Sequence, residues 1–153
     1  MASRSLDDLD PRVQPTARAV VKAWKDKGFE GLITCTYRSN EEQEVLYSKG
    51  RGGVPGPRVT YARAGQSFHN HGLAIDFVPV VNGKLLWDSD SPLWGILARI
   101  AMEVDPTIEW GGYWSPRKRD LPHIQFRIHE SGTPSDLAGG TLPPPNAPHW
   151  EKA

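Results

Sequence analysis

Apolar positions near the N-terminus repeat with the spacing of one helix face. That face would carry Val13, Ala17, Val20, Val21 and Trp24. Pro15 is compatible with the first turn of such a helix, and Gly28 with a stop at its C-terminal end. We therefore predict an amphipathic helix over residues 14–27.

The pattern then changes to a run of β-branched and aromatic residues, which is typical of a strand over residues 32–37. Directly after it, Ser39 and Glu42 have the spacing of a capping box, in which each side chain bonds the backbone of the other residue. Apolar residues follow, so we predict a second helix over residues 40–49.

Residues 50–67 follow as a long segment rich in glycine and proline. Seven of its eighteen positions are Gly or Pro, so the segment is expected to be a loop. Loops of this length inside a compact domain are usually functional or disordered.

The next apolar run predicts a strand over residues 74–78. Pro79 lacks a backbone N–H, so we expect the strand to end there or to lie at an edge of its sheet. Asn82 and Gly83 form a typical two-residue hairpin turn, and residues 84–87 would return beside the strand.

A third helix is predicted to begin at Ser91-Pro92 and to run to Val104, because apolar residues recur there at helical spacing. Two short strands, residues 108–110 and 123–128, flank a loop over residues 111–121. Helices and strands that are mixed along the chain and include a hairpin predict an α+β fold with a small antiparallel sheet.

The last part of the chain has a different composition. Five prolines fall between residues 134 and 148, a density that opposes any regular helix or strand. We expect a folded domain over residues 1–130 and a Pro-rich tail over residues 131–153.

Length and charge fit one domain and exclude several classes of protein. The 153 residues carry 18 basic and 18 acidic side chains, and zero net charge argues against general attraction to nucleic acid or membrane surfaces. No stretch approaches the ~20 apolar residues that span a bilayer. The single cysteine, Cys35, excludes an internal disulfide and any multi-cysteine metal site, and fits a buried packing residue.

Two pairs of potential metal ligands lie beside predicted strands. His69 precedes the strand over residues 74–78, and Asp76 lies within it among apolar neighbours, where an unpaired carboxylate is costly. Asp120 and His123 lie three residues apart where the last strand begins.

His69, Asp76 and His123 form a three-ligand set that suits a catalytic zinc ion, which leaves its fourth position to water. Asp120 is then the carboxylate placed to take the proton of that water. The alternative is that these side chains are ordinary solvated groups. His71 fits either a replacement for His69 or a residue that supports the site without binding metal.

Four stretches of the sequence match a known family, in the same order along the chain. They are Thr36-Tyr37-Arg38-Ser39 continuing to Arg51, Gly65 to Asp76, Glu109-Trp110-Gly111-Gly112, and Asp120 to Phe126. The pattern Ser-x-His-x-x-Gly-x-Ala-x-Asp followed by Asp-x-Pro-His is the most specific part. The chain resembles the LAS-type zinc peptidases, which include D-Ala-D-Ala carboxypeptidases, and most of all the phage and bacterial L-alanyl-D-glutamate endopeptidases.

The resemblance implies a zinc site on the sheet, with Zn²⁺ bound by His69, Asp76 and His123. It also implies Asp120 as general base and acid, and Arg38 as the cation that steadies the developing oxyanion. The alternative for Arg38 is a structural salt bridge.

Other residues of the matched stretches are candidates for substrate binding. They are Ser67, His71, Gln43 and Trp110. His71 stands where relatives often carry an aromatic residue, and Trp110 fits either a wall of the cleft or simple packing.

The resemblance implies zinc-dependent hydrolysis of the L-Ala–D-Glu bond in peptidoglycan stem peptides. Basic residues surround both ligand pairs, namely Lys49, Arg51, Arg58, Arg63 and residues 117–119. They suit the free carboxylates of stem peptides, although solvated loop charges are the ordinary alternative. Two other functions remain open: a D-Ala-D-Ala carboxypeptidase of the same fold, and a non-catalytic zinc-containing binding module.

The N-terminal residues have no apolar core and turn acidic at Asp7 and Asp8, so we expect no secretory signal. We then expect a monomer made in the host cytoplasm that reaches the cell wall in the periplasm through a separate membrane pore. Such a protein would be a phage endolysin used for host lysis, or a bacterial protein of prophage origin.

Overall fold

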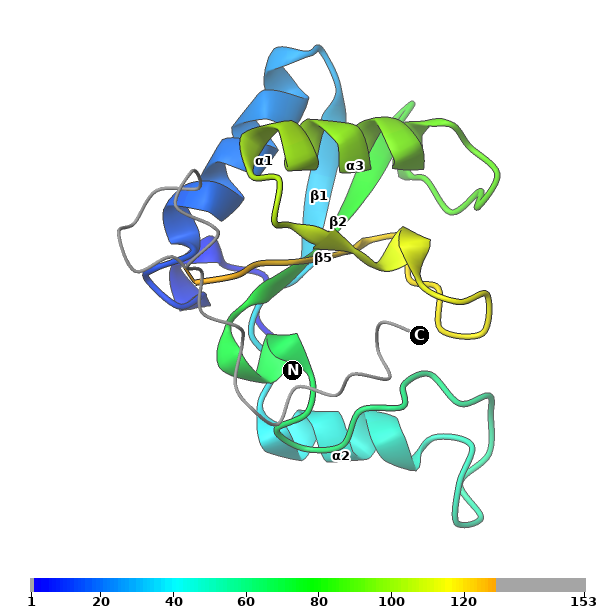
Figure 1. Ribbon diagram of the computed structural model, residues 1–153. Coiled ribbons are helices and arrows are strands. Elements are labelled where there is room, and N and C mark those ends of the chain that lie inside the picture. Colours follow the sequence, from blue (N-terminus) through cyan, green and yellow to red (C-terminus); the bar gives the residue numbers. More distant parts are fainter. Residues whose placement is uncertain (1, 129–153) are drawn as a thin grey trace.

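One small antiparallel sheet organises the chain, whose residues 2–128 are described by this computed structural model (Figure 1). The strand order is β1-β2-β5-β4, and β3 pairs with the far end of β2. The strands are β1 (Glu30–Cys35), β2 (Ala74–Val81), β3 (Lys84–Leu85), β4 (Glu109–Trp110) and β5 (His123–Gln125). The predicted α+β class with an antiparallel sheet is therefore confirmed.

Three α-helices and three short 3-10 helices complete the described part. The α-helices are α1 (Gln14–Asp26), α2 (Asn40–Ser48) and α3 (Leu93–Val104). The 3-10 helices are η1 (Leu6–Asp8), η2 (Phe68–His71) and η3 (Gly111–Tyr113). In Figure 1, α1 and α3 pack against each other at one end of the sheet, and α2 lies at the other end.

The core forms where α1 and α3 meet the sheet. The indole of Trp24 stacks on Phe29 and meets the edge of the Phe77 ring from β2. Leu97 of α3 and Ile75 of β2 are buried in the same cluster. Burying each such side chain contributes about 1.5–3 kcal/mol, so this end of the sheet is a rigid base for the opposite end.

The hairpin turn is confirmed, but the end of its first strand is not. Asn82 and Gly83 both have positive φ, 53° and 75°, as a tight hairpin turn requires. The strand continues past Pro79 to Val81, so the expectation that it ends at Pro79 is wrong. The strand does not lie at an edge there either, because Val80 pairs with both Glu30 of β1 and Leu85 of β3. The proline fits because its carbonyl still accepts the backbone N–H of Leu86, so only the bond from its own missing N–H is lost.

Other predicted boundaries differ by a few residues. The first strand begins at Glu30 and ends at Cys35 rather than Tyr37, because the peptide of Thr36 turns away to bond Ser3. The last strand ends at Gln125 rather than residue 128. The capping box at Ser39 and Glu42 is present.

Two expectations concern other parts of the molecule. The expected Pro-rich tail lies outside the described residues. In the part that the structure describes, no helix combines the length and apolarity needed to cross a bilayer.

The short helix η2 ends at a glycine that cannot be replaced without strain. Gly72 has a φ of 67°, and a Cβ there would lie 2.7 Å from the backbone nitrogen of Asp10. The same backbone nitrogen donates a hydrogen bond to the carbonyl of Gly72. Gly72 thus holds η2, and with it His69, against the N-terminal segment.

We predict that Gly72→Ala lowers the free energy of unfolding by about 1–3 kcal/mol, because it adds both a left-handed conformation and a backbone clash. Gly95→Ala is the matched control. Gly95 lies exposed in α3 with open space around its Cα, so this change should raise stability by about 0.5–1 kcal/mol. Urea unfolding of both variants checks the two signs, and equal effects would contradict the role given to Gly72.

Candidate metal centre and active site

A pocket of about 480 Å³ opens at the end of the sheet away from the core. Its floor contains His69, Asp76, Asp120 and His123, and Arg38 lies in its wall. These five residues come from four separate segments of the chain. The structure therefore brings together all the residues predicted as ligands, base and oxyanion partner.

His69 is oriented by two segments at once. The side chain of Ser67 caps η2 by accepting the backbone N–H of His69. The imidazole Nδ1 lies 2.8 Å from the carbonyl oxygen of Thr36, so Nδ1 carries the proton and donates it there. Its Nε2 then faces Asp76, with 3.1 Å between Nε2 and Oδ1.

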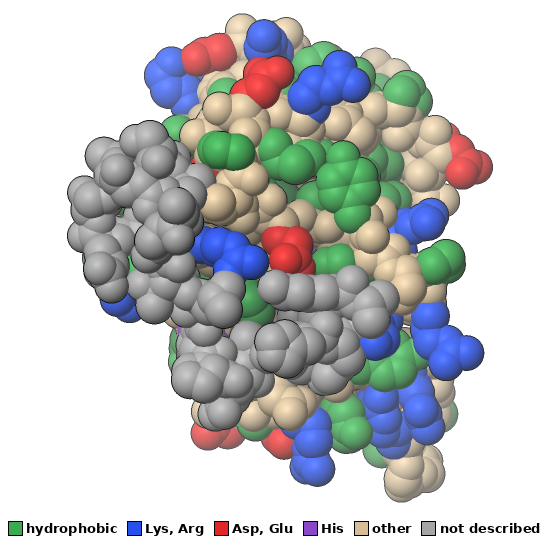
Figure 2. Space-filling view, viewed as in Figure 1, with side chains coloured by type: hydrophobic (Ala, Val, Ile, Leu, Met, Phe, Trp, Pro, Cys, Tyr) green, Lys and Arg blue, Asp and Glu red, His purple; other side chains and the backbone are tan. Residues whose placement is uncertain are grey.

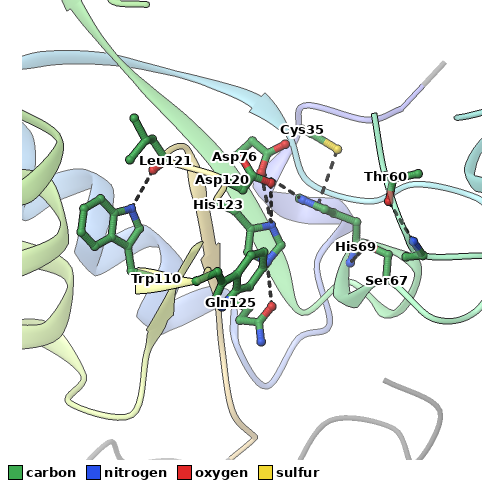
Figure 3. Close-up of polar contacts among 12 residues, drawn as sticks. Cys35, Thr60, Ser67, His69, Asp76, Trp110, Asp120, Leu121, His123 and Gln125 are labelled. Carbon is green, nitrogen blue, oxygen red and sulfur yellow. Dashed lines mark hydrogen bonds and ion pairs between the residues drawn. The ribbon is translucent and has the colours of Figure 1, made fainter. Parts of the chain in front are cut away.

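His123 approaches the same carboxylate from the neighbouring strand. Asp76 of β2 and His123 of β5 are direct partners across the antiparallel pair. The Nδ1 of His123 lies 3.5 Å from Oδ1 of Asp76, and its Nε2 lies 2.7 Å from Oε1 of Gln125. Figure 3 shows both imidazoles turned toward Asp76.

These donors fit a zinc ion. Metal-bound histidines usually donate their second ring N–H to a protein acceptor, and here Thr36 and Gln125 are those acceptors. That leaves one ring nitrogen of each histidine beside a shared carboxylate oxygen, a set of nitrogen and oxygen ligands that zinc accepts. The His69 side chain is almost withdrawn from solvent at 3% exposure, whereas the Asp76 side chain keeps 20% of its surface exposed to the pocket.

Asp76 belongs to both groups of potential ligands that the described residues form. One group joins it with Asp120 and His123, and the other with His69 and Cys35. The Cys35 sulfur lies 3.6 Å from Nδ1 of His69, the nitrogen that bonds Thr36. Cys35 is buried, as predicted, and it is the cross-strand partner of Asp76, so its sulfur lies within 4.8 Å of the ligand atoms of both His69 and Asp76.

The charges of the cluster are strongly interdependent. Burial lowers the pKa of His69, but the Asp76 carboxylate outweighs burial and holds this pKa well above its ordinary value. Burial raises the pKa of Asp76, but the two imidazoles hold it far below its ordinary value. The pocket floor thus favours an ionised carboxylate that is stabilised by neighbouring positive charge, which a metal cation also supplies.

Asp120 lies at the edge of this cluster, with its Oδ2 3.9 Å from Nδ1 of His123. Its partial burial and the nearby Asp76 charge raise the pKa of its carboxyl group. Gly111 fixes its position: the Asp120 N–H donates to the Gly111 carbonyl, and a Cβ on Gly111 would lie 2.3 Å from the Asp120 carbonyl oxygen.

Arg38 is held in the pocket wall by buried partners. Its Nη1 donates to Oε1 of Gln43 at 3.0 Å, and its Nη2 donates to the Cys35 sulfur at 3.5 Å. The side chain of Asn70 does not bond the guanidinium. It donates to the backbone carbonyl of Arg38 and so ties Arg38 to η2. None of these partners is an acid, so these contacts differ from the structural salt bridge considered from the sequence.

Further cations from two distant loops line the same pocket, as expected from the sequence. They are Arg58 from the loop over residues 50–67 and Arg117, Lys118 and Arg119 from the loop before Asp120. Figure 2 shows Lys and Arg side chains gathered on the side of the molecule where Figure 1 places these loops. By contrast, three other cations of that prediction, Lys49, Arg51 and Arg63, are absent from the lining. Arg51 stacks on Tyr47, and Arg63 pairs with Glu44.

The four residues predicted to bind substrate lie in different places. Ser67 lines the pocket, whereas Gln43, His71 and Trp110 are absent from its lining. Gln43 is fully buried and holds Arg38, and its Nε2 donates to the carbonyl of Ala62.

His71 and Trp110 support loops. The Nε2 of His71 lies 2.8 Å from the carbonyl of Gly65, at the end of the long loop. Trp110 is buried, donates to the carbonyl of Leu121, and covers Gly112 so closely that a Cβ there would lie 2.2 Å from the indole. This placement favours the packing alternative for Trp110.

Reasoning from the sequence missed three groups that orient the site. They are the carbonyl of Thr36, the amide of Gln125 and the carboxylate of Glu109, whose Oε2 accepts from Gln125. A backbone carbonyl leaves no signal in a sequence. Gln125 and Glu109 both lie in the stretches that matched the family, but nothing local assigned them a partner.

Comparisons with known proteins agree with this geometry. The family described as D-alanyl-D-alanine carboxypeptidase matches residues 60–126. The peptidoglycan L-alanyl-D-glutamate endopeptidase CwlK of Bacillus subtilis (strain 168) is 40% identical over 127 residues, which cover 78% of this chain and 74% of CwlK.

Solved structures share the fold at lower identity. The Serratia marcescens L-Ala D-Glu endopeptidase ChiX matches with a TM-score of 0.60 and 22% identity, over 82% of this chain and 88% of ChiX. The LD-carboxypeptidase LdcB matches with a TM-score of 0.59 and 18% identity, over 81% of this chain and 61% of LdcB. Together with the relative at 40% identity, these findings show that the chain belongs to the M15 family of zinc-dependent peptidases.

Proposed function

We propose that this protein is a zinc-dependent endopeptidase that cleaves the L-Ala–D-Glu bond of peptidoglycan stem peptides. The observation that carries the proposal is the convergence of His69, Asp76, His123, Asp120 and Arg38 in one pocket. The choice of bond is supported by the 40% identity to an enzyme named for that cleavage.

His69, Asp76 and His123 are the proposed metal ligands, through Nε2, the carboxylate and Nδ1 respectively. A zinc ion held there would supply Lewis-acid chemistry, lowering the pKa of a water toward ~7 and polarising the substrate carbonyl. The hydrogen bonds to Thr36 and Gln125 hold both rings in place before any ligand arrives.

Asp120 is the proposed general base and acid. Its carboxylate takes a proton from the attacking water and then delivers it to the nitrogen of the departing D-Glu residue. A raised pKa makes this carboxylate a stronger base toward the water, and it keeps the resulting carboxyl group protonated nearer to neutral pH, so that it can then act as the acid. Gly111 keeps the Asp120 loop close enough for this transfer.

Arg38 is the proposed oxyanion partner. Gln43 and Cys35 each hold one terminal nitrogen of its guanidinium, so little reorganisation is needed when negative charge develops on the carbonyl oxygen. One preorganised donor of this kind typically stabilises a transition state by about 3–4 kcal/mol.

The cations of the pocket favour an acidic substrate. Arg58 and residues 117–119 face the pocket from opposite loops, and the described lining contains only two acids, both in the proposed centre. Stem peptides carry free carboxylates beyond the scissile bond, beginning with that of D-Glu. The charge arrangement therefore supports cleavage within such a peptide.

A second candidate is a D,D-carboxypeptidase that removes the terminal D-Ala. It is favoured by the description of the matching family, D-alanyl-D-alanine carboxypeptidase. The same residues would carry out that reaction, so the distinction lies in the bond cleaved.

Mass spectrometry of muropeptides separates the two reactions. The zinc-loaded protein should release stem peptides that begin with D-Glu and leave L-Ala on the glycan. Addition of a chelator should stop the release, and restored zinc should return it. Loss of a single D-Ala, with the rest of the stem still attached, would establish the carboxypeptidase instead.

The role of Asp120 is tested by Asp120→Asn, which keeps the shape of the side chain and removes the base. We expect kcat to fall by about 10²–10⁴-fold, with bound zinc and unfolding free energy close to those of the unchanged protein. Asp90→Asn, an exposed change in the loop before α3, is the matched control and should leave kcat unaltered. An Asp120→Asn protein with full kcat would disprove the assignment.

Host lysis by a phage endolysin stays a prediction, and it rests on the proposed cleavage of peptidoglycan. If it holds, cytoplasmic expression in a Gram-negative cell should leave the culture intact until the inner membrane is permeabilised, for example by chloroform. Turbidity should then fall, and Asp120→Asn should prevent the fall. Lysis without permeabilisation would contradict the need for a separate pore.

A further inference from the structure

Three side chains form a hydrogen-bonded series that runs from the proposed metal centre to strand β4. His123 Nε2 lies 2.7 Å from Oε1 of Gln125, and Gln125 Nε2 lies 3.1 Å from Oε2 of Glu109. The indole Nε1 of Trp114 donates to the same Glu109 oxygen at 3.1 Å. Figure 3 shows the bond between His123 and Gln125 pointing away from Asp76.

The carboxylate at the end of this series sets the direction of every hydrogen bond in it. An ionised Glu109 only accepts, so the neighbouring Gln125 must turn its NH₂ group toward it. The carbonyl oxygen of Gln125 then has to face His123 and accept from Nε2–H. His123 is therefore left with its lone pair on Nδ1, the nitrogen that faces Asp76 and Asp120.

We propose that Glu109 and Gln125 are positioning residues that fix the tautomer and ring orientation of His123 for metal binding. The inference rests on the proposed role of His123 as a zinc ligand. It gives a purpose to Glu109 of the Glu-Trp-Gly-Gly stretch, which the catalytic assignments leave unused.

The sheet explains why these residues meet. Glu109 of β4 and Gln125 of β5 are direct partners across the antiparallel pair, where facing side chains lie closest. Gln125 is 2% exposed and His123 is 4% exposed, so neither can exchange its partner for water. Trp114 also lies against His123, with 4.9 Å between ring centroids, and keeps solvent from the bond.

His69 provides an internal contrast. Its tautomer is set by the backbone carbonyl of Thr36, which can only accept a hydrogen bond and never donate one. A primary amide can turn over and present NH₂ in place of its oxygen, so the His123 bond needs a further group to hold the amide in one orientation. Glu109 is that group.

The first test uses two single substitutions, one at Glu109 and one at Gln125. Glu109→Gln keeps the shape but can donate or accept, so the Gln125 amide is no longer held in one orientation. Gln125→Met removes the acceptor of His123 entirely. Each variant should bind zinc about 10–100-fold more weakly than the unchanged protein in competition with a chromophoric chelator.

The sharpest test exchanges the two residues. In Glu109→Gln/Gln125→Glu, the amide at 109 can donate to the carboxylate at 125, which then accepts from His123. The hydrogen-bond directions along the series are restored, so zinc affinity should return to within about threefold of the original. Gln125→Glu alone places two carboxylates side by side and should not recover it.

The tautomer itself is measured by ¹⁵N NMR of the histidine rings in zinc-free protein above the pKa of His123. The unchanged protein and the exchanged double variant should show protonated Nε2 at His123, and Glu109→Gln should show a mixture. A purely structural role would alter unfolding free energy without moving this signal.

Two control variants set the lower and upper limits of the expected loss of zinc affinity. Trp94→Phe removes an indole N–H bonded to the carbonyl of Asp88, away from the pocket, and should leave zinc affinity unchanged. His123→Ala sets the loss expected when the ligand itself is absent. If the unchanged protein binds zinc tightly and Glu109→Gln binds it equally well with an unmixed tautomer, the inference is overturned. If His123→Ala also retains full affinity, the proposed metal centre has failed instead.

Discussion

The carboxylate of Asp76 lies in the central strand of the sheet, and its charge decides how the surrounding residues must be arranged. An unpaired ion taken out of water at such a place costs several kcal/mol. Here His69 and His123 approach the same carboxylate oxygen, one from a short helix and one from the adjacent strand. The site therefore forms only when the register of β2 and β5 and the placement of η2 are both correct.

The surrounding backbone makes that placement rigid. Gly72 allows η2 to pass within bonding distance of the N-terminal segment, and Gly111 allows the Asp120 loop to lie directly against the end of β4. A side chain at Gly72 would displace η2 with His69, and a side chain at Gly111 would displace Asp120, so either change would disturb the proposed metal centre. Stability and function are thus coupled at these two positions, while the hydrophobic core at the other end of the sheet can vary more independently.

Much of the fold follows from local sequence. The first helix, the capping box at Ser39 and the turn at Asn82-Gly83 each depend on residues that are close in the chain, and each was predictable. The early end of β1 was not, because Thr36 takes its partners from Ser3 and His69. Contacts between segments more than thirty residues apart leave no periodic pattern to detect.

The same distinction applies to the site. His69, Asp76 and His123 were candidate metal ligands because His and Asp pairs lie beside two predicted strands, and the resemblance to a zinc peptidase family made them the expected set. By contrast, Gln43 and Trp110 were predicted to meet substrate but are buried, and their polar atoms bond other parts of the protein. A motif shows that a residue belongs to a site, but it does not distinguish contact with the substrate from support of a residue that makes that contact.

The two histidines show why that support takes two forms. The acceptor for His69 is a peptide carbonyl, which is fixed once the chain adopts its path. The acceptor for His123 lies on a strand whose outward neighbour, β4, is only two residues long. So short a strand has few backbone bonds to hold it, and the bonds from Gln125 and Trp114 to Glu109 join β4 and the following loop to β5. The side chains that orient His123 therefore also secure the edge of the sheet, so the order of that edge and the geometry of the centre depend on the same few hydrogen bonds.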